Sequence, residues 1–407
     1  MKPLRLLSWS VLILTSMVLL ADVDPVVSST IPGRARYEYD SIFSFGDSFA
    51  DTGNDIVVFA ANSLANPAAR LPYGMTFFGR PTGRNSNGRL IIDFIAQKLG
   101  LPLPPPFLQP QQKHDGRQQG SNFAVAGAFA RDASFYRDIP VVGAFALNTS
   151  SSVQLRWFQS LCGRHHPYQA DECRGQFRDA LFFMGEFGVN DYSLSLFGKN
   201  LSQIRSFVPD VVKTISTATE EVIRQGATTV VVPGIPPMGC SPPNLAMFAS
   251  ADPADYDPRT GCLKGLNVLA VYHNSLLQEA VRDVGTKHRN VRVIYADFFT
   301  PVIDIVESPA KLGRACCVVE GDEYNLQNYS KRKVLIIIVA GFTRDILRCC
   351  CGGGGKYNFN LSAGCGMPGS TVCQDPTAYL YWDGHFTEAA HRYIADGWLN
   401  SINQCKH

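Results

Sequence analysis

The stretch Ser41-Ile42-Phe43-Ser44-Phe45-Gly46-Asp47-Ser48 decides the fold of this chain. Its mostly apolar part, Ile42–Phe45, has the composition of a buried β-strand, and Gly46 with Asp47 then favours a turn. Open α/β sheets carry reactive side chains on such turns, at the carboxyl ends of their strands. A Gly-Asp-Ser tripeptide alone most often marks a solvated turn, so other segments must decide whether Ser48 is reactive.

The rest of the chain alternates between strand-like and helical patterns. This alternation predicts an α/β fold in which helices wrap a mostly parallel sheet. His273 lies at helical spacing among leucines, so we expect it to be packed or half-exposed rather than catalytic. The expected strands are Ile42–Phe45, Ala180–Met184, Thr228–Val232 and Val291–Ala296, and the expected helices are Leu90–Leu99, Ile204–Gln225, Leu263–Lys287 and Thr387–Ser401.

The amino-terminal segment has the pattern of a secretory signal peptide. Lys2 and Arg5 precede an apolar run, Leu6–Leu20, which is short for a membrane span. We expect residues 1–21 to be removed, with the cleavage point between Ala21 and about Ser29. The mature protein is then extracellular and has no stable membrane insertion. A net charge of +2 gives no electrostatic case for a nucleic-acid partner.

Twelve cysteines in a chain with a secretory signal predict disulfide bonds. Short spacings favour two local pairs, Cys162 with Cys173 and Cys240 with Cys262. The connectivity of a C-terminal cluster stays open, and its spacing fits no common zinc pattern. This cluster comprises Cys349, Cys350, Cys351, Cys365 and Cys373. Acceptor sequences for N-glycosylation suit an exported protein, and they lie at Asn148, Asn200, Asn328 and Asn360.

Four segments that we expect in loops at the strand ends fit one reactive site. Acyl transfer through serine needs a nucleophile, a base that takes its proton and a group that orients the base. Ser48, His385 and Asp383 supply these three roles. The four segments are Gly46–Ser48, Gly120–Ala128, Met184–Asp191 and Tyr381–Ala390.

The same segments supply hydrogen-bond donors for the negative charge that develops on the substrate oxygen. We expect the oxyanion hole to consist of the backbone N–H groups of Ser48 and Gly127 and the side-chain amide of Asn190. Asp191 is expected to tether its loop. His391 is expected to lie on the face of the last helix rather than to act as the base. We expect no metal and no cofactor.

The four segments occur in a specific order, and the chain from Ser41 to Trp398 resembles a plant-type GDSL esterase/lipase of the SGNH hydrolase superfamily. Connecting segments are similar too, among them Pro72-Tyr73-Gly74 and Val232–Cys240. The resemblance implies a three-layer α/β/α sandwich, flavodoxin-like in outline, as a single domain over residues 38–403. It also implies a metal-free serine esterase that acts outside the cell, in the cell wall or apoplast.

Two features depart from the family pattern. The family separates its aspartate and histidine by two residues, whereas only Gly384 stands between Asp383 and His385. We expect this short spacing to pull His385 toward Asp383 and to shift its ring away from Ser48. The second departure is Arg314–Gly341, which interrupts family-like sequence. This insertion is either a retained intron read as coding or a genuine surface excursion, which a long loop permits at small entropic cost.

These observations leave two hypotheses for function. The first is a secreted carboxylic-ester hydrolase that acts through Ser48 on a small-molecule or glycan-linked ester. The second is a catalytically impaired relative that binds an ester or glycan without efficient turnover, and the short spacing between Asp383 and His385 favours it. The acyl and alcohol parts of the substrate stay open, because loops build the pocket and the sequence does not show how they pack.

Overall fold

The computed structural model describes residues 39–110, 120–139, 147–163, 175–309, 341–342 and 345–404. Several predictions lie outside these residues: the signal peptide at residues 1–21, the Cys162–Cys173 pair and the acceptor Asn328. The insertion Arg314–Gly341 also lies outside them, except for its last residue.

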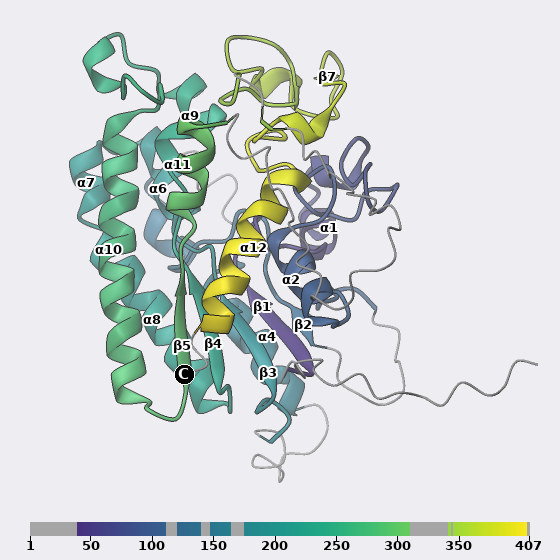
Figure 1. Ribbon diagram of the computed structural model, residues 1–407, viewed down its shortest axis with the longest axis vertical. Helices are drawn as coiled ribbons and strands as arrows, with labels where there is room; N and C mark the ends of the chain where they lie inside the picture. Colours follow the sequence, from purple (N-terminus) through teal and green to yellow (C-terminus); the bar gives the residue numbers. More distant parts are fainter. Residues whose placement is uncertain are drawn as a thin grey trace, which may run out of the picture. The chain divides into compact units, whose positions relative to one another are not determined.

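Five parallel strands form the central sheet in the spatial order β2-β1-β3-β4-β5 (Figure 1). The four longer strands agree with the predicted runs to within one residue at each end. The short strand β2 was not predicted, because its sequence has no apolar run. The strands are β1 (Ser41–Phe45), β2 (Ser121–Asn122), β3 (Ala180–Met184), β4 (Thr229–Pro233) and β5 (Arg292–Ala296).

Helices follow the strands in most of the predicted places. Three predicted helices are confirmed: Leu90–Leu99 as α2, Leu263–Lys287 as α10 and Thr387–Ser401 as α12. The α-helices of the described part are α1 (Asn54–Ala61), α2 (Ile91–Leu99), α4 (Ser151–Gly163), α6 (Val189–Ser193), α7 (Leu201–Arg205), α8 (Val208–Arg224), α9 (Pro242–Met247), α10 (Lys264–Lys287), α11 (Phe299–Glu307) and α12 (Glu388–Gln404).

The helix predicted over Ile204–Gln225 is confirmed as α8 for most of its length, but its first residues belong to a separate helix, α7. Helix α7 ends at Arg205 and α8 begins at Val208. Pro209 lies in the first turn of α8. Proline has no N–H to donate and its ring clashes with the carbonyl four residues earlier, so it is tolerated in a first turn but not inside a helix.

The helices cover both faces of the sheet, because side chains alternate along each strand. Phe43 and Phe45 of β1 belong to one core, which α4, α8 and α10 complete. Ile42 belongs to the other core, with α2, α11 and α12. Figure 1 shows α8 and α10 on one side of the strands and α2 and α12 on the other. This arrangement is the predicted α/β/α sandwich.

Three disulfide bonds lie in the described residues, and one confirms a predicted pair. Cys240 and Cys262 are joined with a Cα–Cα distance of 4.5 Å. The C-terminal cluster, whose connectivity the spacing left open, pairs Cys350 with Cys373 and Cys351 with Cys365. These bonds hold the two-stranded ribbon of β6 (Cys351–Gly352) and β7 (Thr371–Val372). Cys349 remains a buried free thiol.

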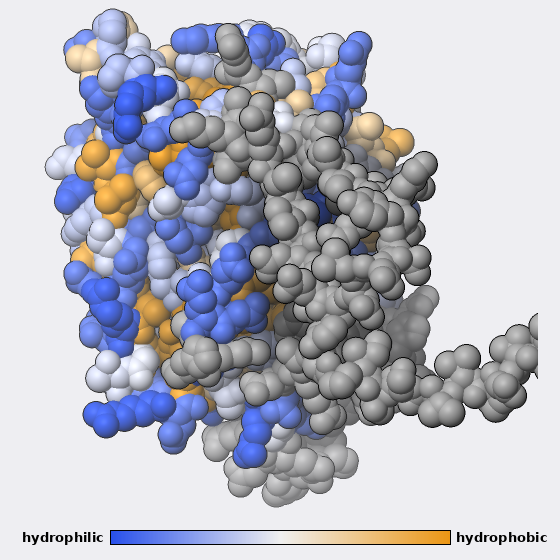
Figure 2. All heavy atoms as spheres, in the orientation of Figure 1, coloured by the Kyte–Doolittle hydropathy of each residue, from blue (hydrophilic) through white to orange (hydrophobic). Residues whose placement is uncertain are grey.

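Figure 2 shows hydrophilic and hydrophobic side chains mixed on one face of the described part of the chain. Most of the coloured side chains there are hydrophilic, and hydrophobic ones lie among them in small groups. None of the helices in the described part of the chain combines the length and apolar character that crossing a bilayer requires.

Candidate active site

The loops that follow β1 and β3 meet where the strand order of the sheet reverses. In flavodoxin-like sheets this switch point, outside the carboxyl ends of the strands, is where ligands bind. Gly46, directly after β1, has φ +143°, and a Cβ there would lie 2.1 Å from the carbonyl oxygen of Gly185 after β3. Only glycine allows this approach, so the turn that carries Ser48 lies directly against the loop that leads to Asn190.

Ser48, His385 and Asp383 form a continuous hydrogen-bonded chain. The Oγ of Ser48 lies 2.8 Å from Nε2 of His385, and Nδ1 of His385 lies 2.9 Å from Oδ1 of Asp383. Ser48 is 8% exposed, and the side chains of His385 and Asp383 are 25% and 17% exposed. The rings of Phe49 and Phe386 pack near one another, and Phe49 also packs edge-on against the imidazole. The three groups are therefore close enough for proton transfer and only partly open to water.

The expectation that the short spacing displaces His385 from Ser48 is wrong. The carboxylate of Asp383 folds back onto its own backbone, where Oδ1 accepts hydrogen bonds from the N–H groups of Gly384 at 2.7 Å and His385 at 2.9 Å. This tight turn brings Oδ1 to the imidazole without an additional residue. Gly384 makes the turn possible, because a Cβ there would lie 2.6 Å from Cγ of Pro243.

The carboxylates around His385 favour the charged form of its imidazole. Burial lowers the pKa of His385, but the charge of Asp383, their hydrogen bond and the charge of Asp47 outweigh it and raise this pKa above its usual value. Burial raises the pKa of Asp383, but the charge of His385 and hydrogen bonds from His385 and Tyr73 outweigh it and hold this pKa below its usual value. An imidazolium that forms at His385 is therefore stabilised by the neighbouring carboxylates.

Asp47 joins the Ser48 turn to Asn190. Its Oδ1 accepts the N–H of Phe49 at 3.0 Å, and its Oδ2 accepts the Asn190 amide at 3.1 Å. The same amide nitrogen donates to the carbonyl of Ala128 at 3.0 Å. Burial raises the pKa of Asp47 to about 7. Both hydrogens of the Asn190 amide are thus engaged, and this amide can bind a further oxygen only by exchanging or sharing one of these bonds.

Gly127 lies in a loop that a second carboxylate holds in place. Asp51 accepts the N–H groups of Gly53 and Asn54 on one oxygen, and those of Asp55 and Ala126 on the other. The turn after Ser48 and the glycine-containing loop are therefore tied together. Gly127 itself has φ +80°, and the position that a Cβ would take there is open space.

Asp191 tethers its loop, as expected. Its Oδ1 accepts the phenol of Tyr136 at 2.5 Å, and its Oδ2 accepts the N–H of Ala130 at 2.9 Å. Burial raises the pKa of Asp191. Among the described residues, the hydrogen bonds of this carboxylate go to Tyr136, Ala130 and Arg131 and not to His385 or Ser48, as for a structural residue.

Two other histidines are buried and neutral. His391 lies on α12, as expected, and burial lowers its pKa to about 3. His273 is fully buried in α10, where Nδ1 lies 2.7 Å from the hydroxyl of Tyr192, and burial also lowers its pKa to about 3. The histidine that contacts Ser48 is His385.

Tyr73 belongs to the site, although no role was predicted for it from the sequence. Tyr73 donates its phenol to Oδ2 of Asp383 at 2.5 Å, although the two residues are 310 positions apart. A buried tyrosine gives no sequence signal of its partner, because the pairing depends on how the loop before α2 packs on the loop before α12.

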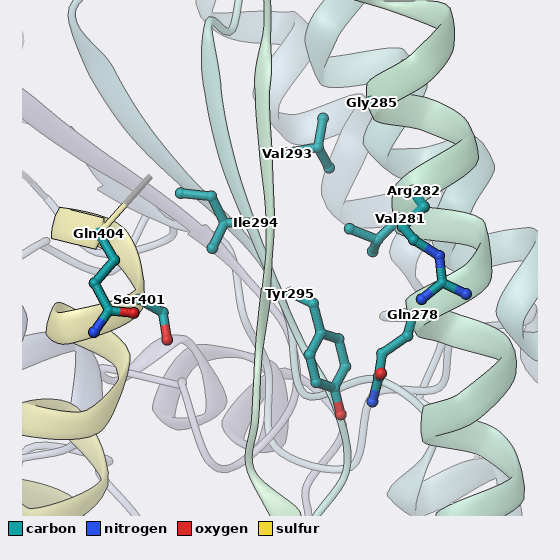
Figure 3. A pocket seen from close by; sticks show the side chains of 9 residues that line it. All are labelled: Gln278, Val281, Arg282, Gly285, Val293, Ile294, Tyr295, Ser401 and Gln404. Atoms are coloured by element: carbon teal, nitrogen blue, oxygen red, sulfur yellow. The ribbon is translucent and has the colours of Figure 1, made fainter. Parts of the chain in front are cut away.

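A cavity of about 410 Å³ lies away from this chain of side chains, at the edge strand β5. Figure 3 shows Tyr295 and Gln278 in the space between β5 and α10, and Ser401 and Gln404 of α12 on the other side of the strand. None of the residues that line it belongs to the four segments. Within the described part of the chain, no group of three or more His, Cys, Asp or Glu side chains is arranged to hold a metal ion.

The fold and the amino-acid comparisons define an α/β ester hydrolase. The sequence profile of the GDSL-like Lipase/Acylhydrolase family matches residues 42–398, and the chain belongs to this family. Sinapine esterase of Brassica napus is 39% identical over 95% of this chain and 92% of its own length. Acetylajmalan esterase 2 of Rauvolfia serpentina is 40% identical over 88% of each chain. A GDSL esterase/lipase of Arabidopsis thaliana is 39% identical over 91% of this chain and 93% of its own.

Proposed function

We propose that the protein hydrolyses carboxylic esters through Ser48 as the nucleophile, His385 as the base and Asp383 as the group that orients the base. The observation that carries this proposal is the hydrogen-bonded chain from Ser48 Oγ through both imidazole nitrogens to Asp383. Each distance permits proton transfer or orientation without rearrangement.

Acylation begins when Ser48 Oγ attacks the ester carbonyl and its proton passes to Nε2 of His385. The tetrahedral intermediate collapses, and His385 gives this proton to the leaving alcohol. Water then attacks the acyl-enzyme, with His385 taking a proton from the water and returning it to Ser48 Oγ as the acid leaves. Asp383 keeps the imidazole in the tautomer that has its proton on Nδ1.

The backbone N–H groups of Ser48 and Gly127 and the side-chain amide of Asn190 are the proposed oxyanion donors. The contact of the two loops at Gly46 and Gly185 supports Ser48 and Asn190 as donors to one oxygen. The hydrogen bonds of Asp51 to Gly53 and Ala126 support Gly127 as the third donor. The Asn190 amide shares one of its hydrogens between its present acceptor, Asp47 or Ala128, and the oxyanion. Losing one such donor typically costs about 3 kcal/mol of transition-state stabilisation.

The setting that we propose is extracellular, with a signal peptide over residues 1–21 followed by a single hydrolase domain over 38–403. The disulfides support an oxidising compartment. The acceptors Asn148, Asn200 and Asn360 are exposed, which suits N-glycosylation. The substrate class is a small-molecule or glycan-linked ester. The names of two relatives, sinapine esterase of Brassica napus and acetylajmalan esterase 2 of Rauvolfia serpentina, support small-molecule esters as the first candidates to test.

The alternative of an impaired binding protein rested on the short spacing between Asp383 and His385. Because the turn at Gly384 accommodates this spacing, we do not retain that alternative.

The experiment compares the mature protein with Ser48→Ala. A panel of acetyl, butyryl, long-chain acyl and feruloyl esters measures turnover, and a fluorophosphonate probe reports the reactive serine. We expect hydrolysis of at least one ester class, labelling at Ser48, and loss of both in Ser48→Ala with an unchanged circular dichroism spectrum. Hydrolysis and labelling that persist in Ser48→Ala would refute the assignment.

A further inference from the structure

Tyr73 lies beside the carboxylate of Asp383, in the loop between η1 (Pro67–Ala69) and α2. It is 2% exposed, and its hydroxyl donates to Oδ2 of Asp383 at 2.5 Å. Its ring packs edge-on against Trp382, with centroids 6.1 Å apart. The N–H of Tyr73 is itself bonded to the carbonyl of Arg70. Backbone and ring are therefore fixed, and the phenol points at one oxygen.

The two oxygens of Asp383 have unequal surroundings. Oδ1 accepts three hydrogen bonds, from the N–H groups of Gly384 and His385 and from the imidazole. Oδ2 accepts a side-chain bond from Tyr73, and no other donor to it lies among the described residues. Without this phenol the carboxylate has three donors on one oxygen and nothing that fixes the other, so its rotation about the Cβ–Cγ bond is less restrained.

The phenol remains protonated at all working pH values. Burial raises the pKa of Tyr73 well above its usual value, and the charge of Asp383 raises it further. Tyr73 is therefore always a donor to Asp383. A donor on Oδ2 takes up part of the negative charge of the carboxylate, which weakens the attraction of that carboxylate for a proton on His385.

We propose that Tyr73 is a positioning residue of the esterase reaction, whose phenol fixes the carboxylate of Asp383 and thereby sets the basicity of His385. The proposal rests on the function proposed above. Tyr73 touches neither Ser48 nor the reacting atoms, and it acts through Asp383.

Tyr73→Phe tests the proposal, because it keeps the ring and removes only the hydroxyl. We expect the pKa of His385 to rise by about half a unit to one unit, because only part of the charge-assisted hydrogen bond at Oδ2 is transmitted through the carboxylate to the imidazole. We also expect kcat to fall about tenfold at the pH optimum, with KM changed less than twofold, because the misoriented base affects the transition state more than binding.

The pKa of His385 is measured by NMR titration of protein labelled with ¹³C-histidine, and His385→Gln assigns the signal. Tyr136→Phe is the matched control, because it removes an equally short, buried phenol–carboxylate bond, to Asp191. We expect Tyr136→Phe to lower the melting temperature and to leave the pKa of His385 unchanged. Near-ultraviolet circular dichroism verifies the packing of each variant.

An unchanged or lowered pKa of His385 in Tyr73→Phe would overturn the proposal, and so would an equal shift in Tyr136→Phe. The titration measures the effect of Tyr73 on the pKa of His385 and does not require that the protein turn over a substrate. Its failure is therefore distinct from failure of the proposed function, which appears as activity retained in Ser48→Ala.

Discussion

Gly384 stands between Asp383 and His385 and has no room for a side chain. A Cβ at this position would lie 2.6 Å from Cγ and 3.2 Å from Cδ of Pro243, whereas ordinary contacts of a Cβ begin at 3.4 Å. Gly384→Ala therefore requires a displacement of about 0.8 Å (3.4 − 2.6). The ring of Pro243 is rigid and lies in the first turn of α9, so we expect the turn that carries His385 to move.

A base displaced by about 1 Å can cost on the order of 100-fold in rate. We therefore expect Gly384→Ala to lower kcat for a chromogenic acetyl ester by roughly 100-fold, with KM changed little. The assay is initial-rate hydrolysis over a range of ester concentrations, with active sites counted by fluorophosphonate labelling. Counting active sites separates slow turnover from a smaller folded fraction.

Two further variants test whether contact with Pro243 causes the loss of kcat. Pro243→Ala removes Cγ and Cδ, and the remaining Cβ lies 4.0 Å from the new methyl group, so the double variant should recover most of the lost kcat. Gly397→Ala, on α12, introduces a methyl group with nothing within 4 Å and should keep wild-type kcat. The steric account fails if Gly384→Ala retains wild-type kcat, or if the double variant is as slow as Gly384→Ala alone.

Four other predictions concern the same reaction and chain. The acid limb of kcat/KM should lie above pH 6.5, because the pKa of His385 is raised and its protonated form cannot accept a proton; a limb below pH 6.5 contradicts this. Asn190→Ala should lower kcat about 100-fold and leave labelling by fluorophosphonate detectable, whereas unchanged kcat would remove the amide from the oxyanion hole. Inserting one apolar residue between Gly384 and His385 should lower kcat at least 100-fold by moving the base. A gain in kcat would instead mean that the short spacing does hold His385 away from its best position. Deleting Arg314–Gly341 should raise the yield of secreted protein, measured by immunoblot of culture medium. The segment adds two cysteines that can mispair and an uncharged apolar run that favours aggregation. A lower yield argues against an inserted segment.

Local sequence patterns were sufficient for most secondary structure. The β-strand at Ala180–Met184 was predicted with the observed bounds, because five consecutive apolar residues between Asp179 and Gly185 can bury both faces. The break between α7 and α8 was missed, although Pro209 was visible, because the apolar period runs on through both helices. The strand β2 was missed because it has only two residues, both polar, so no apolar run indicates its pairing with β1.

The sequence by itself determined the fold class, the Gly-Asp-Ser turn after β1 and the residue types at the site, because strand composition and turn chemistry are local properties. The tertiary structure decided which side chains meet. It placed the imidazole of His385 2.8 Å from Ser48 despite the short spacing, gave Asp383 a phenol from Tyr73, and paired the C-terminal cysteines. Each of these contacts joins separate loops or depends on the path of one turn, and packing against neighbours such as Pro243 fixes that path to within less than an ångström.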